Sequence, residues 1–271
     1  TAKKVAASCA ERMIPVVLEC GGKDPVIVDT DADLKLAAEY ALWSAMANAG
    51  QSCIGAERVY VVESVADEFI ETIVDMAKKI KPGQSYGPAT MPSQLNVIQS
   101  HLDDAKAKGA KFLLGGPDSV KGAFVETVIM VDVPEDSTAM TQETFGPTLA
   151  INKVMNTDEA IKLSNASSYG LAAAVFSKRE GEKIAAKLAC GMVSINSVFL
   201  FAAVASVPFG GVKDSGYGRI HGAEGLLEYT YARTIVKPRF NIPLKFTSFK
   251  RTRLSEKVLV TLIKRLHGKR K

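Results

Sequence analysis

Residues 57–80 read ERVYVVESVADEFIETIVDMAKKI, and this stretch decides the fold. Residues 57–63 carry the β-branched and aromatic side chains that are typical of a strand. In residues 65–80 the apolar side chains recur with helical spacing, which predicts a helix with one face packed inward. A strand followed directly by a helix is the repeating unit of layered α/β proteins.

The same alternation continues on both sides of this unit. Further helices are expected at residues 4–13, 33–49, 95–105, 158–164 and 182–189. Further strands are expected at 16–19, where the strand should be short and buried, and at 111–114, 124–131, 148–154, 172–177 and 192–196. Strands separated by helices of this length imply parallel crossover connections. The sequence therefore predicts an α/β fold with a layered, mostly parallel sheet flanked by helices.

Composition excludes several classes of protein. Of the 271 residues, 47% are hydrophobic and 23% charged, which is enough apolar material for a packed core and excludes disorder as the main state. The longest apolar run, near residues 198–205, is less than half of the ~20 residues that a membrane span needs. The first residues show no secretory signal. We therefore expect a cytoplasmic protein.

The positive charge is concentrated at the C-terminal end. Residues 237–271 hold 12 of the 34 basic side chains and one of the 29 acidic ones, so the remainder of the chain is net acidic. The pattern of residues 254–266 predicts a basic amphipathic helix. Through residues 250–271 the chain could bind an anionic membrane surface, as peripheral membrane proteins do. Alternatively, the apolar stripe packs on the body or on a second subunit. No nucleic-acid partner is expected, because no nucleic-acid-binding motif is visible.

Cysteine and histidine spacing argues against metals and disulfides. The four cysteines are far apart and form no C-x-x-C pair, so free thiols are expected and no metal site. None of the three histidines has metal-ligand spacing from another, and His101 and His221 are expected at the surface or in loops.

Two residues could carry chemistry. Cys53 follows a helix and a Gly-containing turn and precedes a strand, a junction where a thiol can be partly exposed and activated as a nucleophile. The alternative is a small buried hydrophobic residue. Glu19 ends an apolar stretch and stands two residues before a pair of glycines, Gly21 and Gly22. It is either solvated or directed into a cleft, where its pKa would rise toward that of a general base.

Four motifs in the expected order resemble the NAD(P)-dependent aldehyde dehydrogenase superfamily. VLECGGKDP at 17–25 resembles the glutamate signature, and NAGQSCIGAERV at 48–59 resembles the cysteine signature. QETFGP at 142–147 is similar to the cofactor-contacting segment, and PFGGVKDSGYG at 208–218 to the late glycine loop. The resemblance extends from residue 1 to about residue 236.

The resemblance implies a function and a set of roles. The chain would oxidise a small-molecule aldehyde to a carboxylic acid with NAD or NADP. Cys53 would form a thiohemiacetal and then a thioester, and Glu19 would activate the hydrolytic water. Glu143 would bind the nicotinamide ribose and Phe145 would pack nearby; without the resemblance they are a solvated loop acid and a core aromatic. Glu228 matches a position that serves part of the family as a second proton-transfer carboxylate.

The resemblance also implies a domain organisation and points to departures from the family. Residues 1–20 would be the remnant of a truncated cofactor-binding domain, 21–236 the catalytic domain and 237–271 a basic extension. Such a catalytic half would be inactive alone in hydride transfer, and the full-length protein would form a homo-oligomer. Cys20 stands where the family usually has leucine. Two alternative functions remain. The chain could be a non-catalytic assembly module that keeps the fold. It could also be a cysteine hydrolase, although the sequence shows no histidine motif near Cys53.

Overall fold

The computed structural model describes residues 1–240 and 248–268. The chain divides into two compact units, Thr1–Thr230 and Tyr231–Lys271, and each is described by itself. The predicted boundary between the catalytic domain and the basic extension, at residues 236 and 237, falls within the second unit. The assignment of residues 1–20 to a cofactor-binding remnant stays a prediction.

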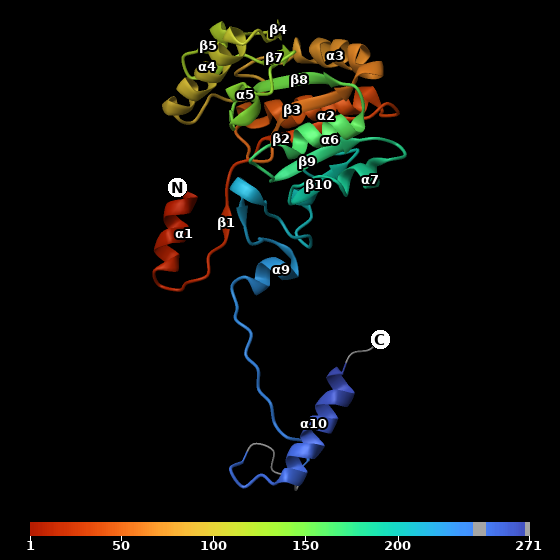
Figure 1. Cartoon of the computed structure of the whole chain (residues 1–271). Coiled ribbons are helices and arrows are strands. Elements are labelled where there is room, and N and C mark those ends of the chain that lie inside the picture. The colour runs from red at the N-terminus through yellow and green to blue at the C-terminus, as the bar shows by residue number, and fades with distance from the viewer. Residues whose placement is uncertain (241–247, 269–271) are drawn as a thin grey trace. The chain divides into compact units, whose positions relative to one another are not determined.

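The first unit contains a seven-stranded sheet (Figure 1). Its order is β10 (Met192–Ile195), β9 (Ala172–Phe176), β2 (Asp24–Val28), β3 (Ala56–Val62), β8 (Thr148–Val154), β7 (Val128–Val131) and β4 (Lys111–Leu114). Each neighbouring pair is parallel except β4 with β7. The predicted α/β class with a mostly parallel sheet is confirmed.

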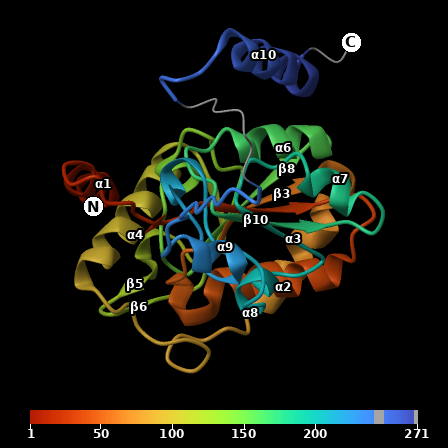
Figure 2. The same cartoon turned by 90° about the horizontal axis from the view of Figure 1, so that it is seen from below.

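Helices cover both faces of this sheet (Figure 2). The core on one face includes α2 (Leu34–Met46) and α3 (Glu63–Ala77). The core on the other face includes α4 (Pro92–Ala107), α5 (Thr138–Thr141), α6 (Thr157–Asn165) and α7 (Gly181–Ala185). Because successive strand side chains point to opposite faces, Val26 and Val28 join the first core and Ile27 the second.

Three differences from the predicted elements have physical reasons. The central strand β2 was not predicted, since a strand buried on both faces shows no polar alternation. The prediction of a buried strand at 16–19 was wrong: β1 (Leu18–Glu19) is partly exposed and pairs outside the main sheet with β11 (Gly216–Tyr217). The predicted strand 124–131 is split into β6 (Phe124–Val125), which pairs with β5 (Val120–Lys121), and β7.

Short helices complete the first unit. They are α1 (Ala2–Ala10), α8 (Leu200–Ala203) and α9 (Gly222–Leu227), with 3-10 turns at Ala47–Gly50, Pro117–Ser119 and Lys213–Ser215. The second unit contains α10 (Arg253–His267), which confirms the predicted helix at 254–266; residues 241–247 and 269–271 of the predicted extension lie outside the described residues. No helix in the described ranges has the length and apolar character needed to cross a bilayer.

Candidate active site

The motif segments meet because they precede neighbouring parallel strands. Gly21 and Gly22 lead into β2, the Cys53 loop leads into β3, and residues 142–147 lead into β8. These three strands are adjacent in the order β2, β3, β8. Since parallel strands begin at the same edge of a sheet, their preceding loops gather at one place (Figure 1). The candidate site therefore lies at the amino ends of the central strands.

Cys53 and Glu19 lie near each other. The half-buried thiol and the Glu19 carboxyl group are close enough for each to affect the ionisation of the other. Burial raises the pKa of Cys53 to about 12, and the neighbouring Glu19 and Asp24 carboxyl groups add to this rise. Burial also raises the pKa of Glu19 above its usual value. In this resting state the thiol keeps its proton, and Glu19 is the group placed to accept it.

A left-handed turn presents Cys53. Asn48, Ala49 and Gly50 have φ values of 54°, 59° and 70°. At Gly50 a Cβ would overlap the carbonyl oxygen of Gly146, so only glycine allows the two loops to approach this closely. Among the residues that the structure describes, the Cys53 backbone N–H has no hydrogen-bond acceptor. It is therefore available to a bound oxyanion.

The late glycine loop holds the strand that carries Glu19. Glu19 pairs with Gly216 in the β1–β11 ladder. Gly216 has a φ of 102°, and a Cβ there would overlap the carbonyl oxygen of Leu18. The buried Ser215 hydroxyl donates to the Gly21 carbonyl at 2.7 Å, and the Cys20 N–H donates to the Ser215 carbonyl at 3.2 Å. The role of this loop is thus to position the glutamate strand.

Glu143 lies over the two glycines that follow this strand. Its Oε1 accepts a hydrogen bond from the Gly22 N–H at 3.0 Å, and its carboxylate occupies the space that a Cβ at Gly21 would need. Burial raises the pKa of Glu143 to about 7. Glu143, Glu19 and Cys20 line the same open groove of about 1010 Å³, which runs along α1. The structure therefore brings Glu143 and Glu19 to one surface.

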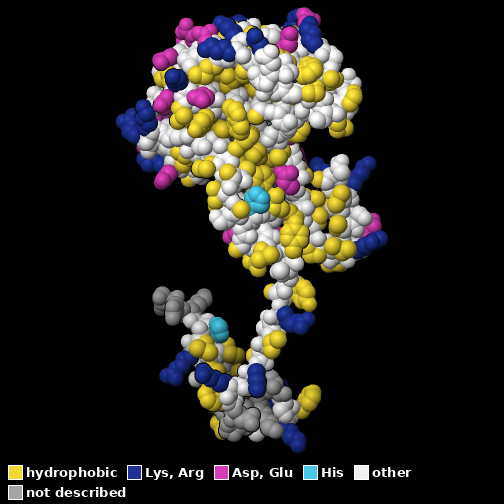
Figure 3. All heavy atoms as spheres, turned by 180° about the vertical axis from the view of Figure 1, so that it is seen from behind, with side chains coloured by type: hydrophobic (Ala, Val, Ile, Leu, Met, Phe, Trp, Pro, Cys, Tyr) yellow, Lys and Arg dark blue, Asp and Glu magenta, His cyan; other side chains and the backbone are white. Residues whose placement is uncertain are grey.

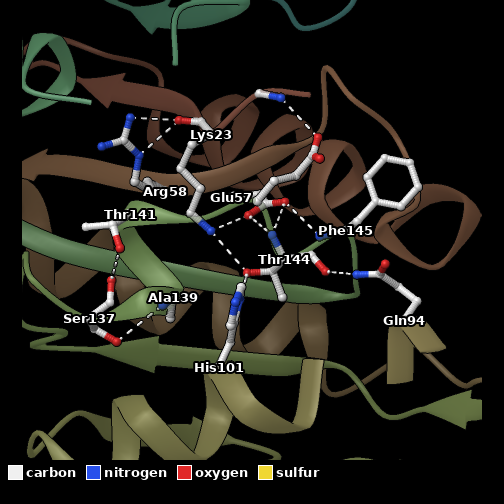
Figure 4. A network of polar contacts seen from close by, with 12 residues as sticks. Lys23, Glu57, Arg58, Gln94, His101, Ser137, Ala139, Thr141, Thr144 and Phe145 are labelled. Carbon is white, nitrogen blue, oxygen red and sulfur yellow. Dashed lines mark hydrogen bonds and ion pairs between the residues drawn. The ribbon is translucent and has the colours of Figure 1, made fainter. Parts of the chain in front are cut away.

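A buried polar network fixes the loop that carries Glu143 and Phe145 (Figure 4). The Glu57 carboxylate pairs with the Lys23 ammonium. It also accepts hydrogen bonds from the Thr144 N–H at 2.9 Å and the Phe145 N–H at 2.9 Å. Phe145 has a φ of 52°, a strained value for a bulky residue. The bond to Glu57 helps to hold it there.

Three further side chains complete this network. Gln94 donates to the Thr144 carbonyl at 2.7 Å, and Arg58 donates to the Lys23 carbonyl at 2.7 and 3.0 Å. His101 is buried and its Nδ1 lies 3.0 Å from Thr144 Oγ1, so the expectation of a surface or loop position was wrong. The cause is α4, which turns His101 toward the core.

Sequence reasoning missed Lys23 and Glu57. Their signal was available, because each is a charged residue at the beginning of an apolar stretch and each lies within a recognised motif. Glu228 is exposed at the end of α9, and no hydrogen bond or ion pair within the described ranges joins it to Cys53. No group of His, Cys, Asp and Glu side chains that could hold a metal ion occurs in residues 1–240 and 248–268.

Removing the charge of Glu57 should destabilise the first unit. Glu57→Gln leaves the buried Lys23 ammonium unpaired, and we expect a loss of about 3–5 kcal/mol in the free energy of unfolding. Combining Glu57→Gln with Lys23→Met removes both charges and should recover part of this loss. Urea denaturation measures both values. If Glu57→Gln were as stable as the wild type, the proposed contribution of the Lys23–Glu57 pair to stability would be contradicted.

Glu143 should make stability depend on pH. Between pH 4.5, its ordinary value, and about 7, the folded protein keeps a proton on Glu143 that the unfolded chain has released. Stability therefore falls as pH rises through this window. We expect Glu143→Gln to reduce this fall in urea denaturation at several pH values. Glu39→Gln, which removes an exposed carboxylate from α2, controls for net charge; identical slopes in wild type and Glu143→Gln would refute the assignment.

Known proteins resemble this chain in sequence and in structure. The aldehyde dehydrogenase family model matches residues 1–235. The chain is 39% identical over 249 residues to a 4,4'-diapolycopene aldehyde oxidase of Methylomonas sp, covering 90% of this chain and 47% of the relative. It is 40% identical over 255 residues to a Mycobacterium ulcerans protein that carries the name of an NADP+ succinate-semialdehyde dehydrogenase, covering 89% and 49%.

Solved structures agree with this result. A betaine aldehyde dehydrogenase of Staphylococcus aureus in complex with NAD+ superposes with a TM-score of 0.79 and 36% identity, covering 84% of this chain and 48% of that one. A point mutant of the same enzyme gives a TM-score of 0.82 at 34% identity, covering 91% and 53%. The chain spans about half the length of the curated relatives it matches. The matched family model and these identities show that the chain belongs to the aldehyde dehydrogenase family.

Proposed function

We propose that this chain carries the acyl-transfer centre of an NAD(P)-dependent aldehyde oxidation. The proximity of the Cys53 thiol and the Glu19 carboxyl group is the observation that supports this most directly. It places a nucleophile near a base from a separate loop, which is the arrangement that activates a weak nucleophile. Family membership supports the same reaction class.

The side chains act in two stages. Glu19 accepts the Cys53 proton as the sulfur attacks the aldehyde carbon, and the free Cys53 N–H stabilises the oxyanion of the thiohemiacetal. After the hydride has left, Cys53 holds the acyl group as a thioester. Glu19 releases its first proton to solvent and then removes a proton from water as the water attacks the thioester carbon. The carboxylic acid leaves, and the proton returns to the sulfur.

The residues present fit a nicotinamide cofactor. The groove lined by Glu143 and Glu19 has a volume of about 1010 Å³, at the upper end of the range for ligand sites. The two Glu143 oxygens suit the hydroxyl donors of a ribose, and Phe145 lies beside them in the chain. NAD+ or NADP+ accepts the hydride when bound. The names of relatives include both cofactors.

We propose the predicted domain organisation on the same basis. Residues 21–236 would form the catalytic domain, and residues 1–20 would belong to a cofactor-binding domain. This fits a chain that spans about half of its relatives. We also propose a cytoplasmic location, which four free cysteines suit, and homo-oligomerisation through the sheet edge at β10, which pairs only with β9 among the described strands.

Substitution of Cys53 and substitution of Glu19 should impair different steps of the reaction. In the full-length protein mixed with NAD+ and an aldehyde, we expect Cys53→Ala to abolish the burst of NADH. Glu19→Gln should slow steady-state turnover by about 10²–10⁴-fold, because the hydrolytic water loses its base. Cys190→Ala, which removes another free, half-buried cysteine, is the matched control. An unchanged burst in Cys53→Ala would refute this assignment.

We further propose that α10 lies on an anionic membrane surface. Leu254, Leu262, Ile263 and Leu266 are between 48% and 68% exposed in the second unit. These apolar residues and Val258 share one side of the helix. Residues 250–265 also carry six basic side chains and one acidic one, Glu256. An exposed apolar face bordered by positive charge complements anionic lipid headgroups.

Vesicle sedimentation checks this proposal. We expect the chain to sediment with phosphatidylserine-containing vesicles, and Leu262→Glu with Ile263→Glu to prevent this by removing the apolar face of α10. Lys257→Gln with Lys264→Gln should weaken the binding and its dependence on salt. Equal sedimentation of the wild type and the Leu262→Glu, Ile263→Glu variant would exclude α10 as the contact. Self-association in place of lipid binding would point to a second copy of the chain.

A further inference from the structure

The carboxyl ends of β2 and β9 form a crevice at the edge of the sheet opposite the candidate active site. These two strands are parallel neighbours. The chain leaves β2 for α2, which packs in the first core, and leaves β9 for α7, which packs in the second (Figure 2). Because the two connections leave to opposite faces, a crevice opens between the strand ends. Open α/β sheets bind ligands in crevices of this kind, whereas the proposed oxidation uses the other edge.

A polar pocket occupies this crevice. Its volume is about 500 Å³, which is within the range of small-molecule sites. Residues 29–31 after β2, 156–158 after β8 and several of 179–187 around α7 line it. Of the twelve lining residues only two, Ile161 and Ile184, are apolar. A ligand that fits the pocket is therefore polar, with one small apolar part.

A single hydroxyl group lies between two carboxylates beside the pocket. Ser177 Oγ is 2.9 Å from Asp29 Oδ2 and 3.0 Å from Asp31 Oδ1. A hydroxyl group carries one hydrogen, so Ser177 donates to only one of the two carboxylates. The Arg179 Nε–H donates to Asp31 at 2.8 Å, and this hydrogen bond holds the pKa of Asp31 at about 2. Asp31 therefore has a strong donor of its own.

Asp29 is the carboxylate with unused acceptor capacity. It lines the pocket and is 7% exposed. Its Oδ1 accepts hydrogen bonds from the Thr30 N–H at 2.8 Å and from the Thr157 hydroxyl at 3.1 Å. Within the described residues, Oδ2 has the shared Ser177 hydroxyl alone. Because a carboxylate oxygen has two lone pairs, Oδ2 has room for a further donor. An acidic side chain in such a position suits a sugar hydroxyl.

Two lysines supply positive charge to the same pocket. Lys183 pairs with Glu180 at 2.9 Å, and Lys187 pairs with Asp158 at 2.9 Å. All four side chains are at least half exposed, so each ion pair is weak. Figure 3 shows other charged side chains of opposite sign on one face of the first unit. A phosphate group, with its higher charge and several acceptor oxygens, therefore competes well for both lysines.

We propose that this pocket binds a mononucleotide, whose ribose hydroxyls donate to Asp29 and whose phosphate pairs with Lys183 and Lys187. The base then packs on Ile161 and Ile184. The pocket has about half the volume of the groove along α1, which suits one nucleotide in place of a dinucleotide. This second site is separate from that groove and does not depend on the proposed role of Cys53.

Calorimetric titration of the full-length protein with AMP tests the charged part of the pocket. NAD+ at a saturating concentration fills the groove along α1, so that AMP then reports on the crevice. We expect AMP to bind under these conditions. Lys183→Glu with Lys187→Glu should weaken this binding at least about tenfold, because both charges beside the phosphate are reversed. Lys78→Glu with Lys79→Glu, a matched change at exposed lysines outside the pocket, should leave it unchanged.

Titration with 2′,3′-dideoxy-AMP tests the role of Asp29. This analogue keeps the base and the phosphate but lacks both ribose hydroxyls, so it should bind the wild type about tenfold more weakly than AMP. Asp29→Asn should remove most of this difference, since the amide is a weaker acceptor than the carboxylate. The comparison of the two nucleotides on the wild type remains decisive even if Asp29→Asn fails to fold. Inorganic phosphate, as a further probe, should bind more weakly than AMP.

Three results would overturn the proposal. AMP binding that NAD+ abolishes and that persists in Lys183→Glu with Lys187→Glu would place the nucleotide in the groove along α1. Equal affinity of the wild type for AMP and for 2′,3′-dideoxy-AMP, or for inorganic phosphate, would exclude recognition of the ribose. Absence of AMP binding both with and without NAD+ would exclude a mononucleotide site. None of these results bears on Cys53 and the proposed oxidation.

Discussion

The site depends on one buried carboxylate. Glu57 lies at the start of β3 and pairs with Lys23, which directly precedes β2. Its carboxylate also accepts hydrogen bonds from the N–H groups of two successive residues in the loop before β8. It thus ties together the three segments that carry the candidate residues. A buried ion pair adds little net stability when compared with hydrocarbon, but breaking it is costly. The physical consequence is that these loops have one favoured arrangement.

Close backbone contacts make that arrangement compact. Gly50 lies against Gly146, Gly216 against Leu18, and the Glu143 carboxylate against Gly21. At Gly50 and Gly216 a Cβ would overlap backbone atoms and φ is positive, so glycine is required at both positions. At Gly21 the space of a Cβ is taken by the end of the Glu143 side chain. The glycine motifs therefore act as spacers between loops. They allow Cys53 and Glu19 to meet although they belong to different connections.

The electrostatics follow from this compactness. Carboxyl groups brought together away from water hold their protons more tightly, which accounts for the raised pKa values of Glu19 and Glu143 and for a thiol pKa of about 12 at Cys53. A protonated resting thiol beside a carboxylate suits proton transfer during attack on an aldehyde.

Local sequence was enough to predict the α/β class and most helices and strands. It also contained the motifs around Cys53, Glu19, Glu143 and Phe145. Both are readable from sequence because periodicity and short motifs depend on neighbours along the chain. It did not reveal β2, whose uniform burial removes the polar alternation. Nor did it place His101, or join Lys23 to Glu57, because these contacts connect distant segments. Only the tertiary structure decided them, since the order of parallel strands determines which loops share an edge.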